Sequence, residues 1–180
     1  ISLTVCGYIG GVILGLFLGL GQISKKKWIY WPCKIYVDVF RGTPMLVQIF
    51  IIHLALLPSI FGHSFGWFTS GVIALVLNSA AYNAEIFRAG IQAVPKGQME
   101  AARSLGMSRA KAMIHVILPQ GIKNSLPAIC NEFIINIKDT SVLNVIGLTE
   151  LFAWNKFIIT QTADAIACYV ILAIIYLTLT

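Results

Sequence analysis

The sequence from residue 42 to residue 84 contains no Lys, Arg, Asp or Glu, and this uncharged run is the strongest constraint on the fold. A helix needs about 20 apolar residues to cross the hydrocarbon core of a bilayer, so the run is too long for one crossing. Residues typical of a turn interrupt it near its middle, at Pro58, Gly62, His63 and Gly66. The run therefore predicts a hairpin of two membrane spans, over residues 43–57 and 67–88.

Three further apolar stretches, over residues 1–24, 125–145 and 165–180, add one predicted span each. Hydrophobic residues make up 58% of the chain and charged residues 11%, against about 25% charged in a soluble domain. We therefore expect an all-α, polytopic helical membrane protein with about five transmembrane helices. They form a single domain over residues 1–180. The first stretch lacks the basic leader of a signal peptide and is expected to stay in the membrane. Because both ends of the sequence lie in apolar runs, we expect further chain at each end.

Glycine recurs at every fourth residue of the first predicted span, at Gly7, Gly11, Gly15 and Gly19. This spacing places the glycines on one helix face, where small residues allow another helix to approach closely. General tolerance of glycine in membrane helices is the simpler explanation. We favour a packing seam.

Basic residues gather in two of the predicted connections, 25–41 and 88–123, and are absent from the connection 58–66. Short loops rich in Lys and Arg stay in the cytoplasm. Five spans would then place the N-terminus outside and the C-terminus in the cytoplasm. The net charge of +6 is explained by this topology. We expect no nucleic-acid partner, because such a protein gathers its basic residues on one solvated face.

The connection after the third span is much longer than a membrane hairpin needs. Its pattern predicts a short helix over residues 97–106, which Gly106 would end because glycine is favoured just past a helix end. Ser108 is placed to cap a second helix, 109–118, that Pro119 would end. Such length suggests that the connection meets a partner.

The same connection carries a motif. Glu100-Ala101-Ala102 is followed by Gly106 and then by Leu118-Pro119, at the spacing of the "EAA" signature of permease subunits of bacterial ATP-binding-cassette (ABC) importers. Segments 41–44, 82–90 and 138–141 read RGTP, YNAEIFRAG and KDTS. Together they resemble the polar amino-acid (His/Glu/Gln/Arg/opine) branch of that family, and the resemblance covers nearly the whole chain.

The resemblance implies a type I ABC importer permease (MetI-like) fold in the bacterial cytoplasmic (inner) membrane, with residues 91–120 forming a cytoplasmic EAA loop. Its short helix would be the coupling helix, which docks into a cytoplasmic ATP-binding subunit through Glu100, Ala101, Ala102, Leu105 and Gly106. Small Ala101 and Ala102 are expected to leave a low surface suited to a groove. A second permease subunit, identical or related, would complete the path. An extracytoplasmic amino-acid-binding protein would deliver the substrate.

Catalysis is not expected of this chain. It contains no G-x-x-x-x-G-K-[ST] sequence, so it cannot bind nucleotide phosphates by the P-loop route. We expect no catalytic residues, no metal site and no directly bound cofactor. ATP would be used by the partner subunit, and membrane lipid would surround the spans.

Ionisable residues within spans are costly and usually functional. Glu132 and Asp139 lie seven residues apart, on nearly the same helix face and about 10 Å apart along the axis. Asn136 lies between them, and Asn83 is a polar residue of the third span. These four are the candidate substrate-binding residues. Two acids favour a cationic amino acid, although pairing with Lys138 or a neighbouring span is an equally simple role.

Two other kinds of protein remain open at this point. A secondary transporter or channel subunit would use Glu132 and Asp139 for ion coupling, but it would need two related halves or discontinuous helices. An intramembrane enzyme would combine the same acids with His53. Neither explains the EAA segment. For Glu85 in the third span, an ion pair with Arg88 is the simplest expectation.

Overall fold

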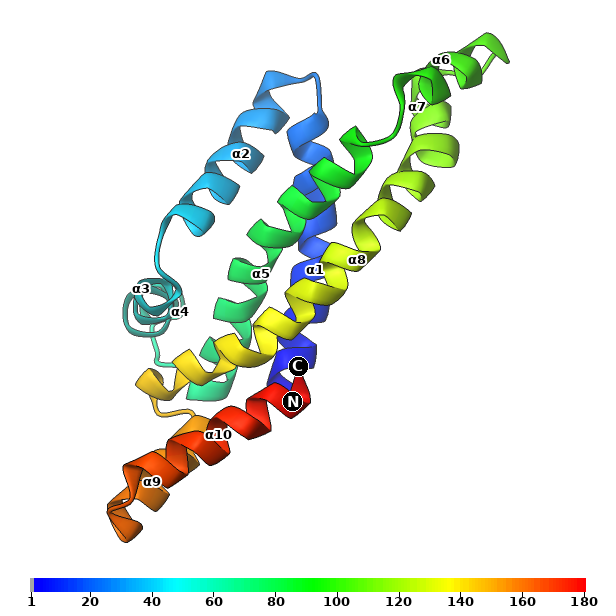
Figure 1. Cartoon of the computed structure of the whole chain (residues 1–180). Helices are drawn as coiled ribbons and strands as arrows, with labels where there is room; N and C mark the ends of the chain where they lie inside the picture. Colours follow the sequence, from blue (N-terminus) through cyan, green and yellow to red (C-terminus); the bar gives the residue numbers. More distant parts are fainter. Residues whose placement is uncertain (1) are drawn as a thin grey trace.

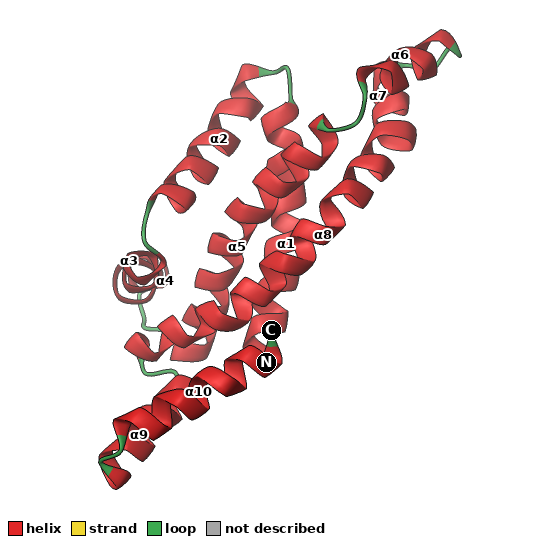
Figure 2. Ribbon diagram, viewed as in Figure 1, coloured by secondary structure: helices red, strands yellow, loops and turns green. Residues whose placement is uncertain are grey.

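The computed structural model describes residues 2–180, so Ile1 of the predicted first span lies outside the described residues. The described chain consists of helices joined by short loops and contains no strand (Figure 2). Its centre is formed by three long helices, α1 (Ser2–Ile23), α5 (Trp67–Gln92) and α8 (Leu118–Asp139) (Figure 1). The predicted all-α, polytopic class is confirmed.

The described chain contains fewer helices that could span a membrane than the sequence predicts. Among the described residues, α1 alone is long and apolar enough to cross a membrane as one straight helix, and two bent helix pairs raise the number to three. The prediction was about five. The difference arises because α5 carries Asn78, Asn83, Glu85 and Arg88, and because the last helix, α10 (Ala165–Leu179), has only 15 residues.

The glycine face of α1 packs directly on α5. A β-carbon built at Gly11 would lie 2.6 Å from the Cβ of Ser79, and one at Gly15 would lie 2.9 Å from the backbone oxygen of Ala80. Gly7 and Gly19 meet α5 in the same way, one helical turn to either side. The two backbones therefore approach so closely that no side chain fits between them. The predicted packing seam is confirmed.

The second span begins earlier than predicted. Residues 25–41 were expected to form a connection, but α2 (Lys27–Gly42) is a helix packed on α1 and α5. The chain then turns through extended backbone at Thr43 and Pro44, because a proline disfavours helical geometry in the residue before it. The following helix, 45–61, lies at 111° to α2. It comprises α3 (Met45–Phe50), the π-helical η1 (Ile51–Leu56) and α4 (Leu57–Phe61).

Pro119 does not end a helix, contrary to the prediction. The short α7 (Arg109–Ala112) continues through a π-helical stretch, η2 (Met113–Ile117), directly into α8. A proline removes one helical hydrogen bond and crowds the preceding turn, and π-type adjustments accommodate this in membrane helices. The fourth span therefore belongs to a continuous helical rod that starts at residue 109 rather than at residue 125.

After α8 the chain continues as a 3₁₀ helix, η3 (Thr140–Ile146), and then as α9 (Leu151–Thr162) and α10. The Glu150 carboxylate caps α9 and accepts a hydrogen bond from Tyr176 of α10 at 3.5 Å. Glu150 lines a hollow together with residues 2–4 of α1. The described part of α10 thus returns to the end of the bundle where α1 begins (Figure 1). This arrangement does not support the predicted placement of the two termini on opposite sides.

Candidate docking helix and intramembrane polar cluster

The predicted short helix exists as α6 (Lys96–Ser104), at one far end of the molecule (Figure 1). Its last turn is closed by hydrogen bonds from the Gly106 N–H to the Arg103 oxygen and from the Met107 N–H to the Ala102 oxygen. Gly106 has φ +83°, the left-handed conformation that favours glycine. Ser108 then caps α7 by accepting a hydrogen bond from the Lys111 N–H at 3.3 Å. Both sequence predictions about these helix ends are confirmed.

Glu100 and Ala101 lie on the outer face of α6, and Leu105 follows its last residue directly; all three are exposed. Leu105 is 82% exposed, more than any other large apolar side chain of the described residues. Ala102 is only 4% exposed and faces inward. The prediction that Ala102 contributes to the outer surface is therefore wrong. Ala102 is instead covered by the chain itself, whereas Ala101 remains exposed.

The inner face of α6 is anchored to two other helices. Met99 packs against a buried apolar cluster formed by Ile91, Val94 and Ile117, which come from the end of α5, the loop after it and η2. A force applied to the outer face of α6 would thus reach α5 and the rod that continues into α8.

A polar cluster lies inside the bundle, where α8 faces α5. Glu132 and Asn136 of α8 are 7% and 3% exposed. The Asn136 amide donates to the Glu132 backbone oxygen at 3.1 Å and to its carboxylate at 3.4 Å. From α5, the Ser79 hydroxyl donates to the Asn136 side-chain oxygen at 3.4 Å. Two of the four candidate substrate residues are therefore in direct contact.

Asn83 joins the same cluster from α5. It is fully buried and donates to the Ser79 backbone oxygen at 2.9 Å, while its side-chain oxygen has no partner among the described residues. Tyr8 of α1 closes the cluster by donating to the backbone oxygen of Ile129. Sequence reasoning missed Ser79 and Tyr8. A signal was present, because Ser79 lies one helical turn before Asn83 and Tyr8 adjoins the glycine seam.

Asp139, the fourth candidate, lies at the end of α8 and is partly buried. Within residues 2–180 it forms neither a side-chain hydrogen bond nor an ion pair, so the structure does not bring it into the cluster. Glu132 likewise has no ion pair in that part of the chain. Pairing of either acid with Lys138, the simpler role considered above, is not observed.

Glu85 forms the expected ion pair with Arg88 of its own helix, and this prediction is confirmed. It also lies 3.9 Å from the guanidinium of Arg41 on α2. Arg88 in turn donates to Gln92 at 2.7 Å. The Glu85 carboxylate therefore links α2 with α5. Glu132 is buried and has no cationic partner among the described residues.

Comparison with known proteins agrees with this architecture. The L-cystine transport system permease protein TcyB of Bacillus subtilis (strain 168) is 44% identical over 177 residues, which cover 98% of this chain and 75% of that protein. A crystal structure of an amino acid ABC transporter with histidines matches with a TM-score of 0.90 and 47% identity, covering 99% of this chain and 82% of that one.

The fold extends to more distant proteins. The MetNI methionine ABC transporter in an inward-facing conformation matches with a TM-score of 0.78 at 21% identity, over 98% of this chain and 86% of that one. Residues 11–180 match the family model described as "binding-protein-dependent transport system inner membrane component". The chain belongs to this family of transport-system membrane components.

Proposed function

We propose that the chain is the permease subunit of an ABC importer that moves polar amino acids across the cytoplasmic membrane, using ATP hydrolysed by a separate subunit. The observation that carries this proposal is the exposed face of α6, which Met99 holds against residues at the end of α5 and in η2. Relatives named for cystine transport and solved with histidines support amino acids as the substrate class. In this proposal ATP is bound by the partner and not by this chain.

The proposed assembly has three kinds of partner. A cytoplasmic ATP-binding subunit docks on Glu100, Ala101, Leu105 and the turn at Gly106. A second permease, identical or related, completes the translocation path, and an extracytoplasmic binding protein delivers the amino acid. We place the α6 end in the cytoplasm, because Lys25, Lys26 and Lys27 follow α1 at that end and basic loops stay inside. The start of α1 then faces outward.

An affinity-purification experiment tests the proposed partnership. The chain, tagged and expressed with the neighbouring subunits of its transport system, is expected to retain a cytoplasmic ATPase in mild detergent. Leu105→Asp places a charge on the highly exposed apolar side chain directly after α6 and is expected to release the ATPase. Ser64→Asp is the control, since Ser64 is exposed in the loop between α4 and α5, outside the predicted spans and away from α6. Equal retention by both variants would contradict docking through α6.

We propose further that the cluster of Glu132, Asn136 and Asn83 contacts the ammonium or guanidinium of the substrate, with Asp139 assisting from the end of α8. Support comes from a buried carboxylate without a cationic partner and from the unpartnered side-chain oxygen of Asn83. Both are acceptors, as a cationic ligand requires. This arrangement favours basic amino acids.

Glu132→Gln keeps the shape of the side chain and removes its charge. A charge-assisted hydrogen bond contributes about 1.5–3 kcal/mol, so the apparent KM for arginine uptake is expected to rise at least about tenfold. A smaller rise is expected for Asp139→Asn. Asp38→Asn on the exposed face of α2 removes an acid outside the cluster and serves as the control. Unchanged apparent affinity in both variants would remove these acids from the substrate site.

A further inference from the structure

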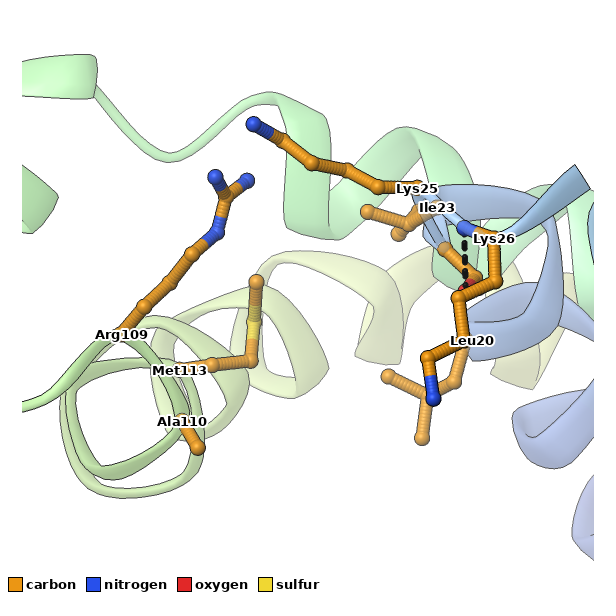
Figure 3. A pocket seen from close by; sticks show the side chains of 8 residues that line it. Leu20, Ile23, Lys25, Lys26, Arg109, Ala110 and Met113 are labelled. Carbon is orange, nitrogen blue, oxygen red and sulfur yellow. Dashed lines mark hydrogen bonds between the residues drawn. The ribbon is translucent and has the colours of Figure 1, made fainter.

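A cavity of about 540 Å³ lies between the end of α1 and the start of the α7–α8 rod. Its floor is apolar and is formed by Leu20, Ile23, Ala110 and Met113. Its rim is basic and is formed by Lys25, Lys26 and Arg109. Lys25 and Lys26 follow the last turn of α1, and Arg109 begins α7 on the opposite wall. Figure 3 shows the Lys26 side chain running back beside Leu20, whereas Lys25 extends toward Arg109.

The basic rim has no acidic counterpart. Figure 3 shows Lys25 and Arg109 extending their charged ends toward each other from opposite walls. No acid lines the cavity, and neither residue takes part in an ion pair within the described chain. Two cations facing each other repel, and an anion held between them would turn that repulsion into attraction.

The position of the cavity identifies the kind of anion. It opens where the apolar span α1 ends, and Trp28, 73% exposed, lies beside it with its ring 5.7 Å from the Lys26 ammonium. Exposed tryptophan at a span end is typical of the membrane–water boundary. A free phosphate would use only the basic rim, whereas a phospholipid would also cover the apolar floor. Basic pockets between helices at this depth suit anionic headgroups.

We propose that this cavity binds an anionic phospholipid, with the headgroup phosphate between Lys25 and Arg109 and an acyl chain along Leu20, Ile23 and Met113. These three apolar residues also pack on the cluster of Ile91, Val94 and Ile117 that anchors Met99 of α6. The lipid would therefore support the apolar cluster on which α6 packs. Binding of the lipid is independent of the proposed function; only its effect on ATP-driven transport rests on that proposal.

The test uses the complete permease–ATPase complex in nanodiscs of phosphatidylcholine, alone or mixed with phosphatidylglycerol. Lipid retained by the protein is measured by native mass spectrometry. Lys25→Gln with Arg109→Gln is expected to lower the affinity for phosphatidylglycerol about 30-fold, from the loss of two basic residues. Lys111→Gln with Lys123→Gln removes the same charge outside the cavity and is expected to retain the lipid. Lys25→Arg with Arg109→Lys keeps both charges and is expected to restore retention.

Three results would overturn the proposal. Equal loss of phosphatidylglycerol in both Gln pairs would show a general charge effect. If soluble glycerol phosphate displaced phosphatidylglycerol as well as added phosphatidylglycerol does, the cavity would be a site for a free phosphate. Release of the ATPase subunit by the Lys25/Arg109 pair, with lipid retention unchanged, would assign this surface to the ATPase. Because retention is measured without transport, failure here leaves the proposed import function untouched.

Discussion

Gly106→Asp is expected to leave the permease folded and inserted but to reduce ATP-driven uptake by at least about tenfold. Gly106 has φ +83°, and a left-handed conformation costs most L-residues roughly 1–2 kcal/mol. A β-carbon at this position meets nothing within 4 Å in the described chain. The new carboxylate therefore projects from the docking surface, where it repels or displaces a partner rather than disturbing the chain's own packing. Uptake and ATPase activity of the reconstituted complex are the measurements.

Two matched variants separate the causes of this loss. Gly97→Asp adds the same charge within α6, at a position that is equally open and has no left-handed backbone, and near-normal uptake is expected. Gly106→Asn has the shape of Asp without its charge and tolerates the left-handed conformation. Near-normal uptake with Asn would assign most of the effect to charge, and intermediate uptake would divide it between charge and side-chain size. Normal uptake by Gly106→Asp would contradict docking at this turn.

Gly15→Leu is expected to prevent stable folding of the membrane bundle. A β-carbon at Gly15 would lie 2.7 Å from the Cβ of Asn83 and 2.9 Å from the Ala80 oxygen. Backbone atoms cannot move aside as a flexible side chain can, so α1 and α5 would have to separate. Overpacking by a few methylenes typically costs 1–3 kcal/mol, and a whole leucine side chain is expected to exceed this. The variant should elute as aggregate in detergent, with little monodisperse complex.

Gly42→Leu is the control for the seam. Gly42 ends α2, and a β-carbon there meets nothing within 4 Å. Its elution profile is expected to match that of the parent complex, and its melting temperature is expected to stay within a few degrees of the parent value. A stable, monodisperse Gly15→Leu complex would show that α1 and α5 do not pack as closely as the structure indicates.

The parts of the fold that sequence predicted best are those set by local pattern. Glycine at every fourth residue identified the face of α1 that meets α5, and the positive φ of Gly106 followed from its place after a helical run. The errors arose where packing overrides local preference. Lys34 and Arg41 made 25–41 resemble a loop, but in α2 Lys34 pairs with Asp38 and Arg41 lies near Glu85 of α5. The apolar residues Trp31, Ile35 and Val39 are exposed on α2.

The candidate site was predicted only in part, because local spacing identifies a helix face but not its neighbours. Helical spacing placed Glu132 and Asn136 on one face, and the structure confirms that they touch. Spacing along one helix says nothing about which neighbour it faces, so the contributions of Ser79 and Tyr8 required the packed bundle. Asp139, seven residues after Glu132, lies on nearly the same face of the helix but does not share the contacts of Glu132.

The most direct test of the account is uptake by the complete complex in proteoliposomes, with labelled arginine and with histidine, glutamine and glutamate as competitors. We expect saturable uptake that requires ATP, the separate ATPase subunit and an intact α6 face, and we expect basic amino acids to compete best. Uptake that continues without ATP or the ATPase subunit, driven by an ion gradient through Glu132 and Asp139, would contradict it.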